Sequence, residues 1–92
     1  MLFPENEKFG LVNQLRRSSV SVPSNIAEGA SRKSNKDFAR FLEIAIGSCY
    51  EMETQIMLSN DLGFINQKTL KLTLEDLEAI IKMTSKFKST LK

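Results

Sequence analysis

Apolar residues recur at intervals of three and four along three long stretches of this 92-residue sequence, and this spacing limits the folds open to it. Such spacing places apolar side chains on one face of an α-helix. No segment alternates apolar and polar residues between turns, so strands are not expected. The sequence therefore predicts an all-α, antiparallel up-down helical bundle with three long helices, in a single domain over residues 1–92. The second stretch is the clearest, with Phe38, Phe41, Leu42, Ala45, Ile46, Cys49, Met52 and Ile56 on its apolar face.

The first stretch contains a proline, within a helical pattern that starts near Asn6, a residue able to cap the helix. A proline inside a helix removes one hydrogen bond and costs about 3 kcal/mol unless the helix bends. Either the helix kinks at Pro23, or it stops near Ser21 and restarts with Ser24 or Asn25 as a cap. The apolar pattern resumes in phase just beyond this point, which favours the kink.

Glycines and capping residues mark the other helix boundaries. Gly29 and the polar run 31–35 indicate the first connection, and Ser34 begins a sequence that resembles a capping box. A left-handed conformation at Gly63 is expected to end the second helix. Asn66 can cap the third helix. The apolar stripe of the third helix comprises Leu70, Leu74, Leu77, Ile80 or Ile81, Met83, Phe87 and Leu91.

The chain has no His and a single Cys, and these counts exclude whole classes of active site. Ser-His-Asp and Cys-His catalysis need a histidine, and a Cys-based zinc site or a disulfide needs more than one cysteine. Carboxylate metal sites in helical bundles pair Glu with His, so Glu43, Glu51 and Glu53 are not expected to bind metal. Cys49 lies on an apolar stripe and is expected to be a buried thiol. The sequence thus predicts a protein that is not an enzyme and uses no cofactor.

Charge is unevenly distributed along the chain, although the net charge is only +2. Residues 1–40 hold seven basic and four acidic side chains, residues 41–79 hold two basic and seven acidic ones, and residues 80–92 hold four lysines and no acid. This division suits either a polyanionic ligand or complementary packing between copies of the chain. No apolar run is long enough to span a membrane and no signal peptide is recognisable, so a cytoplasmic location is expected.

The first basic group is the best candidate for a ligand-binding surface, because arginine suits bidentate contacts with phosphate. The alternative is that these side chains are solvated or pair with Glu from a neighbour, since no aromatic residue is interleaved with them for base stacking. A second basic group, at the end of the third helix, could equally complement the helix dipole. The first group comprises Arg16, Arg17, Arg32, Lys33, Lys36 and Arg40, and the second comprises Lys82, Lys86, Lys88 and Lys92.

Asn25 and Glu28 are polar residues in an apolar neighbourhood beside Pro23. Because they are three positions apart on a helix, they are expected to satisfy each other or the N–H groups freed at the bend. A lone Glu28 without His, Cys or a second carboxylate nearby gives poor support for catalysis. We therefore expect a structural role for both residues.

Several of these segments together resemble a known family, the four-helix-bundle proteins encoded by intervening sequences in bacterial 23S ribosomal RNA genes. The resemblance covers most of residues 9–65 and is weaker over the third helix. The segments that carry it are Leu15-Arg16-Arg17-Ser18-Ser19-Val20-Ser21-Val22-Pro23-Ser24-Asn25-Ile26-Ala27-Glu28-Gly29, Phe38-x-x-Phe41-Leu42-x-Ile44-Ala45-x-Gly47-Ser48, Glu51-x-Glu53-Thr54-Gln55 and Leu62-Gly63-Phe64-Ile65.

The resemblance implies a four-helix bundle that assembles as a ring, typically a homopentamer. It also implies kinship with the accessory protein of diversity-generating retroelements, whose basic surface engages nucleic acid and a reverse transcriptase. Carried over residue by residue, the basic positions 16, 17, 32, 33 and 40 become the expected RNA or DNA contacts, whereas Pro23, Asn25 and Glu28 become architectural, together with Ser24 and Gly29 of the same segment. Two functions are therefore expected: an oligomer associated with structured RNA, or an oligomeric adaptor that binds another protein and no nucleic acid.

The chain departs from the family pattern at its N-terminus. Family members usually carry another amphipathic helix before the segment that matches Leu2-Phe3-Pro4, and this chain offers three helices where the family has four. A late start codon, a truncated chain or a member without that helix would each explain the difference. We expect an uncovered apolar groove between the first and second helices, filled by another subunit. A short chain also predicts a thin core.

Overall fold

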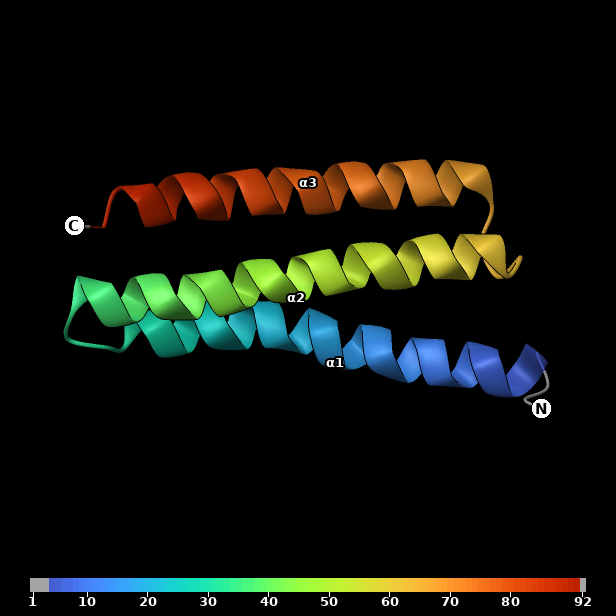
Figure 1. Cartoon of the computed structure of the whole chain (residues 1–92), viewed down its shortest axis with the longest axis horizontal. Helices are drawn as coiled ribbons and strands as arrows, with labels where there is room; N and C mark the ends of the chain where they lie inside the picture. Colours follow the sequence, from blue (N-terminus) through green and yellow to red (C-terminus); the bar gives the residue numbers. More distant parts are fainter. Residues whose placement is uncertain (1–3, 92) are drawn as a thin grey trace.

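The computed structural model describes residues 4–91, and over this range the chain forms three α-helices and no strands. The helices are α1 (Pro4–Ala30), α2 (Asn35–Asp61) and α3 (Gln67–Ser89). They run alternately up and down, with α2 between α1 and α3 (Figure 1). The predictions of an all-α class and of three long helices are confirmed.

The molecule is long and thin, with principal extents of 47 × 24 × 15 Å. Its radius of gyration is 15.1 Å, whereas a compact domain of this length has about 12 Å. The backbones of α1 and α3 each pack on α2 and not on each other within the described part of the chain. Each outer helix therefore has one neighbour, and only α2 has two.

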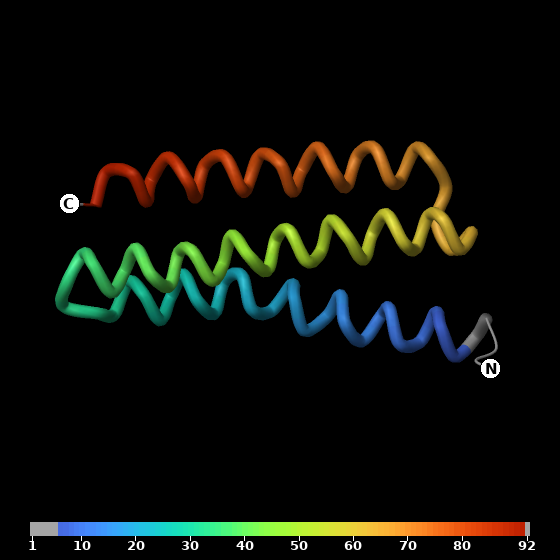
Figure 2. Tube along the Cα trace, viewed as in Figure 1, coloured from blue at the N-terminus to red at the C-terminus, as the bar shows by residue number. Residues whose placement is uncertain are grey.

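Pro23 lies inside an uninterrupted α1, so the alternative of a helix that stops and restarts is wrong. The trace of α1 changes direction near its middle (Figure 2), as expected where proline removes one N–H group and crowds the carbonyl four residues earlier. The helix begins at Pro4, a residue suited to a first turn because that turn needs no N–H donor. Asn6 is thus inside the helix, and the prediction that it is the cap is wrong.

The other predicted boundaries are confirmed by their hydrogen bonds. The Ser34 side chain accepts a 3.1 Å bond from the backbone N–H of Asp37, and Asn66 Oδ1 accepts a 2.8 Å bond from the N–H of Thr69. Gly63 has φ = 81°, and a hydrogen bond of 2.8 Å from the N–H of the next residue to the Ser59 carbonyl closes the end of α2. This arrangement is a Schellman motif, which requires a left-handed residue at the position of the glycine.

Gly29 was predicted to mark the first connection, but this prediction is wrong. The residue is buried in the last turn of α1. A Cβ atom built there would lie 2.8 Å from Phe41 Cβ and 2.9 Å from Phe38 Cδ1. Real Cβ atoms essentially never approach so closely. The glycine therefore permits the close approach of α1 and α2 beside their connection.

The core is thin, as predicted, and its buried apolar side chains are few. Met83 and Phe87, which were predicted on the apolar stripe of the third helix, are 65% and 47% exposed. The buried apolar residues within the described range are Leu11, Leu42, Ala45, Cys49, Leu77 and Ile81. Val22, Ile46, Met52 and Ile80 pack around the part of the core made by Cys49, Leu77 and Ile81.

An open apolar hollow of about 240 Å³ is bounded by all three helices. Val22 and Pro23 line it from α1, Cys49 and Met52 from α2, and Leu77 with Ile80 from α3. The sequence predicted an apolar groove between the first and second helices. One hollow between these two helices is lined by Leu11, Leu58 and Leu62 together with polar residues, whereas the hollow midway along them is lined by polar side chains. The filling of the groove by another subunit stays a prediction.

Candidate nucleic-acid interface

The connection between α1 and α2 presents four basic side chains on a short, rigid turn. The N–H of Arg32 donates a 3.1 Å hydrogen bond to the Gly29 carbonyl, and the cap at Ser34 starts α2 only four residues after the end of α1. Arg32 and Lys33 lie in the turn, whereas Lys36 and Arg40 lie on the first two turns of α2, and all four side chains are exposed. Their proximity follows directly from their spacing in the sequence.

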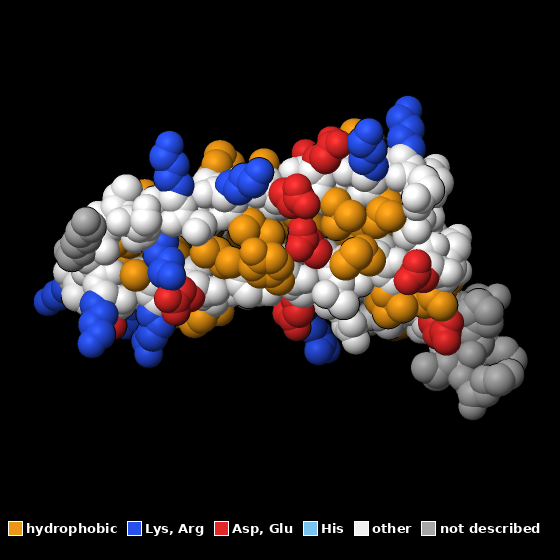
Figure 3. Space-filling view, turned by 45° about the horizontal axis from the view of Figure 1, so that its top comes forward, with side chains coloured by type: hydrophobic (Ala, Val, Ile, Leu, Met, Phe, Trp, Pro, Cys, Tyr) orange, Lys and Arg blue, Asp and Glu red, His pale blue; other side chains and the backbone are white. Residues whose placement is uncertain are grey.

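The C-terminal part of α3 lies beside this connection, at the same end of the molecule (Figure 1). The Phe38 and Phe87 rings meet edge to face with centroids 5.4 Å apart, and Lys88 Nζ lies 2.7 Å from Glu43 Oε1. These two contacts bring Lys86 and Lys88 to the α1–α2 connection. Arg and Lys side chains gather there in the space-filling view (Figure 3). We call this surface the basic end, and its members are Arg32, Lys33, Lys36, Arg40, Lys86 and Lys88.

Two arginines of the basic end are oriented by an aromatic ring. The guanidinium carbons of Arg32 and Arg40 lie 5.0 and 5.4 Å from the centroid of the Phe41 ring, within the range of cation–π contacts. Arg32 also forms an ion pair with Glu28, one turn earlier on the chain. Phe41 therefore lies beside two members of the basic group, although the sequence reasoning counted no aromatic residue among them for base stacking.

Arg16 and Arg17 lie in the middle of α1 and not at the basic end. Arg32 follows Arg17 by fifteen residues, which corresponds to roughly 22 Å along a helix. Both side chains are exposed, and Arg17 lines the polar hollow between α1 and α2. The structure thus divides the predicted set of contacts, and a nucleic-acid role for these two arginines stays a prediction.

The second predicted basic group is also divided. Lys82 lies one turn before Lys86 on α3, where it lines a hollow with Glu53 and Glu78. Lys92 lies outside the described residues. Among the described lysines of this group, Lys86 and Lys88 join the basic end, and sequence reasoning did not connect them with residues 32–40. The sequence did contain a signal for this proximity. Three helices of similar length that run alternately up and down bring the end of the third helix back to the first connection.

The hydrogen bonds of the segment around Pro23 differ from those expected, and its structural role stays a prediction. Asn25 Nδ2 donates to the carbonyl and the hydroxyl of Ser21, at 2.8 and 2.9 Å, and Ser21 Oγ lies 2.8 Å from Ser48 Oγ on α2. Asn25 and Glu28 do not satisfy each other, because Glu28 pairs with Arg32. Ser24 is exposed on α1. A short polar network therefore links the bent part of α1 to α2.

No cluster of three potential metal ligands occurs among residues 4–91. Cys49 is 1% exposed, and burial, followed by the negative charge of Glu53, raises the pKa of its thiol above the ordinary value. A buried thiol with a raised pKa is a poor nucleophile at neutral pH. No helix in the described range is long and apolar enough to cross a membrane.

Comparison with known proteins bears on this site. A search of curated proteins finds none that matches the chain. A family match does exist, and it covers all three helices except the last residues of α3. Because residues 1–86 match the family described as 23S rRNA-intervening sequence protein, the chain belongs to that family.

Proposed function

We propose that this protein is a non-enzymatic binding protein that contacts structured RNA through its basic end. The observation that carries the proposal is the convergence of six cationic side chains, from the connection and two helices, on one end of the molecule. Three carboxylates, those of Glu28, Asp37 and Glu43, lie in the same region. An excess of positive charge remains, and the description of the family supports RNA as the polyanion.

The geometry of the basic end suits phosphate groups. Phe41 holds two guanidinium groups in defined positions, so less side-chain freedom is lost when they bind. The lysines add charges that need no particular direction. Contacts of this kind position a protein on a nucleic acid without reading its sequence. We therefore expect affinity to depend more on RNA shape and salt than on base sequence.

The test measures the affinity of a fluorescently labelled RNA hairpin by anisotropy between about 50 and 300 mM salt. The triple variant R32S/K33S/K36S is expected to bind more weakly and to lower the slope of log affinity against log salt by about two to three, because each lost phosphate contact removes about 0.7–0.9. The matched control K8S/K68S/K71S removes the same charge from exposed lysines at the opposite end. Equal losses in both variants would contradict a defined interface, and a DNA hairpin of the same sequence tests the preference for RNA.

We also infer that the protein acts as a homo-oligomer. Its accessible surface is 6565 Å², whereas a compact monomer of this size exposes roughly 5400 Å². The apolar hollow between the three helices and exposed side chains such as Val20, Met83 and Phe87 give a second copy apolar surface to cover. Light scattering measures the number of copies, for which the sequence resemblance implies five.

The same experiment separates the RNA-binding function from that of an adaptor. If R32S/K33S/K36S remains oligomeric but no longer binds RNA, the basic end is the RNA-binding surface. If the variant dissociates the oligomer and the unaltered protein does not bind RNA, the basic end serves contacts between subunits, and the adaptor function replaces the proposed one.

A further inference from the structure

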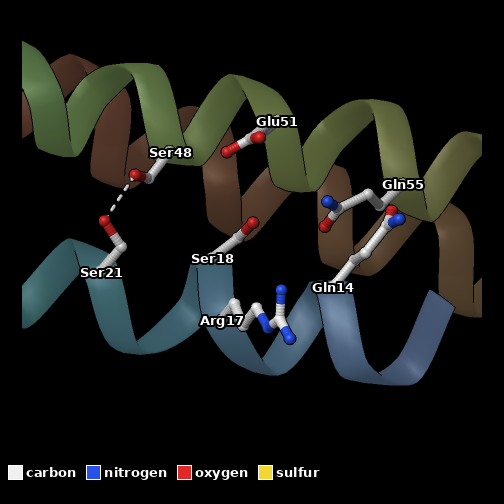
Figure 4. Close-up of a pocket in the computed structure, with 7 residues that line it drawn as sticks. All are labelled: Gln14, Arg17, Ser18, Ser21, Ser48, Glu51 and Gln55. Atoms are coloured by element: carbon white, nitrogen blue, oxygen red, sulfur yellow. Dashed lines mark hydrogen bonds between the residues drawn. The ribbon is translucent and has the colours of Figure 1, made fainter. Parts of the chain in front are cut away.

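A polar hollow of about 440 Å³ lies between the middles of α1 and α2, and α3 lies behind it in the close-up (Figure 4). Arg17 and Ser18 line it from α1, and Ser48, Glu51 and Gln55 line it from α2. A space of this size falls within the range of small-molecule sites. The hollow is separate from the basic end, since neither group contains a residue of the other.

Gln55 is the unusual residue of this hollow. Its side chain is only 8% exposed, its amide group extends into the space between the two helices, and its Oε1 has no hydrogen-bond donor (Figure 4). The buried serine hydroxyls nearby do have hydrogen-bond partners. Ser48 Oγ bonds to Ser21 Oγ, and the Ser59 hydroxyl donates to the backbone carbonyl of Gln55. A buried acceptor without a partner lowers stability, and an apolar residue of similar size would avoid that cost. A ligand that brings a donor to Gln55 explains why an amide is found here.

The hollow also presents both signs of charge. Arg17 from α1 and Glu51 from α2 line it from opposite sides, and neither forms an ion pair with any residue that the structure describes. Ser18, which is 5% exposed, adds a hydroxyl group to the wall. A ligand that satisfies all these groups must carry an N–H donor with positive charge at one end and an anionic group at the other.

We propose that this hollow binds a small zwitterion of the α-amino acid class. Its ammonium group donates hydrogen bonds to the Glu51 carboxylate and, once the buried Gln55 amide turns toward the hollow, to Gln55 Oε1. Its carboxylate accepts hydrogen bonds from the Arg17 guanidinium. The side chain of the ligand points toward the open side of the hollow. This site does not depend on RNA binding, since it shares no residue with the basic end.

The test uses ¹⁵N-labelled protein and three probes: L-glutamine, its N-acetyl derivative, which lacks the ammonium group, and L-glutaminamide, which lacks the carboxylate. L-glutamine at up to about 20 mM is expected to shift the backbone amide signals of residues 14–21 and 48–55, and both derivatives are expected to bind at least tenfold more weakly. R17Q and E51Q should each weaken L-glutamine binding at least tenfold. The controls R16Q and E53Q remove the same charges outside the hollow and should leave binding unchanged.

A further variant separates binding from folding. Q55L removes the acceptor that lacks a partner, so it should raise the melting temperature while abolishing the shifts caused by L-glutamine. Absence of shifts with unaltered protein, equal binding of the three probes, or equal losses in the control variants would overturn the proposal. It would also be overturned if R17Q and E51Q changed the mass measured by light scattering and not the affinity for L-glutamine, because the hollow would then be a contact between copies.

Discussion

At the scale of single residues, two glycines on neighbouring helices have opposite surroundings. Gly29 faces α2 so closely that a Cβ atom would meet Phe41 Cβ at 2.8 Å, whereas nothing lies within 4 Å of a Cβ atom at Gly47. Both residues lie within helices, where glycine by itself is unfavourable. The pair therefore separates the effect of packing from the effect of helix propensity.

We predict that Gly29→Ala lowers the free energy of unfolding by about 1–3 kcal/mol, because the added methyl group pushes α1 away from α2. Gly47→Ala is expected to raise it by about 0.5–1 kcal/mol, because alanine favours the helix and restricts the unfolded chain. Urea titration followed by circular dichroism measures both changes. A stabilised Gly29 variant would show that the two helices are not in such close contact.

Cys49 gives a second prediction at this scale, because burial raises the pKa of its thiol. The folded state then holds the thiol proton more tightly than the unfolded state does. The contribution of the protonated thiol to the free energy of unfolding is fully present below the ordinary thiol pKa of about 8.5. This contribution is lost as pH rises through the higher pKa of the folded state. The unaltered protein should therefore lose more stability between pH 7 and pH 10 than Cys49→Ala, which lacks the thiol. Urea midpoints at the two pH values measure the difference, and equal losses would contradict the raised pKa.

Part of this residue-level description could be predicted from sequence and part could not. A capping residue acts through its own neighbours in the chain, so the roles of Ser34 and Gly63 followed from local sequence. Gly29 was misplaced because its function depends on Phe38 and Phe41 across a helix contact. The buried amide of Gln55 had no sequence signal, since glutamine in an amphipathic helix is usually exposed.

At the scale of helices, the start of α3 depends on one side chain. Asn66 Oδ1 accepts the N–H of Thr69 at 2.8 Å, and this bond satisfies one of the donors left free in the first turn. We predict that Asn66→Ala lowers the free energy of unfolding by about 1 kcal/mol. Asn66→Ser keeps an acceptor and should be nearly neutral in the same urea titration. A loss of equal size with serine would show that the cap does not account for the effect.

The apolar periodicity of the sequence predicted the positions of the helices better than it predicted which side chains are buried. Apolar spacing located all three helices and the apolar face of α2, because this face packs against neighbours on two sides. The same spacing placed Met83 and Phe87 on the apolar stripe of α3, yet they are 65% and 47% exposed, although the Phe87 ring meets Phe38 of α2. How far a neighbouring helix covers such a stripe is not a property of the periodicity of one segment.

At the scale of the whole molecule, the basic end arises from the lengths of the helices. α2 has 27 residues and α3 has 23, which correspond to about 40 and 35 Å. The chain therefore leaves the first connection and returns almost to it, so lysines about fifty residues later lie beside it. Arg16 and Arg17 are closer to the connection in sequence but remain near the middle of α1. The candidate surface was thus only partly predictable, since its composition depends on where the chain returns.

The position of α2 between two helices that do not pack on each other also determines how the fold comes apart. The α1–α2 pair has the close approach at Gly29 and the bond between Ser21 and Ser48. In the described part of the chain the backbone of α3 packs on α2 and not on α1, so α3 can detach as a unit while the helical hairpin of α1 and α2 remains.

Hydrogen exchange followed by mass spectrometry should therefore show the slowest exchange in the middle of α2, intermediate exchange in α1 and the fastest helical exchange in α3. Equal protection of the three helices would instead indicate that they open together. We therefore expect the outer helices to unfold before α2, with the C-terminal helix α3 detaching first.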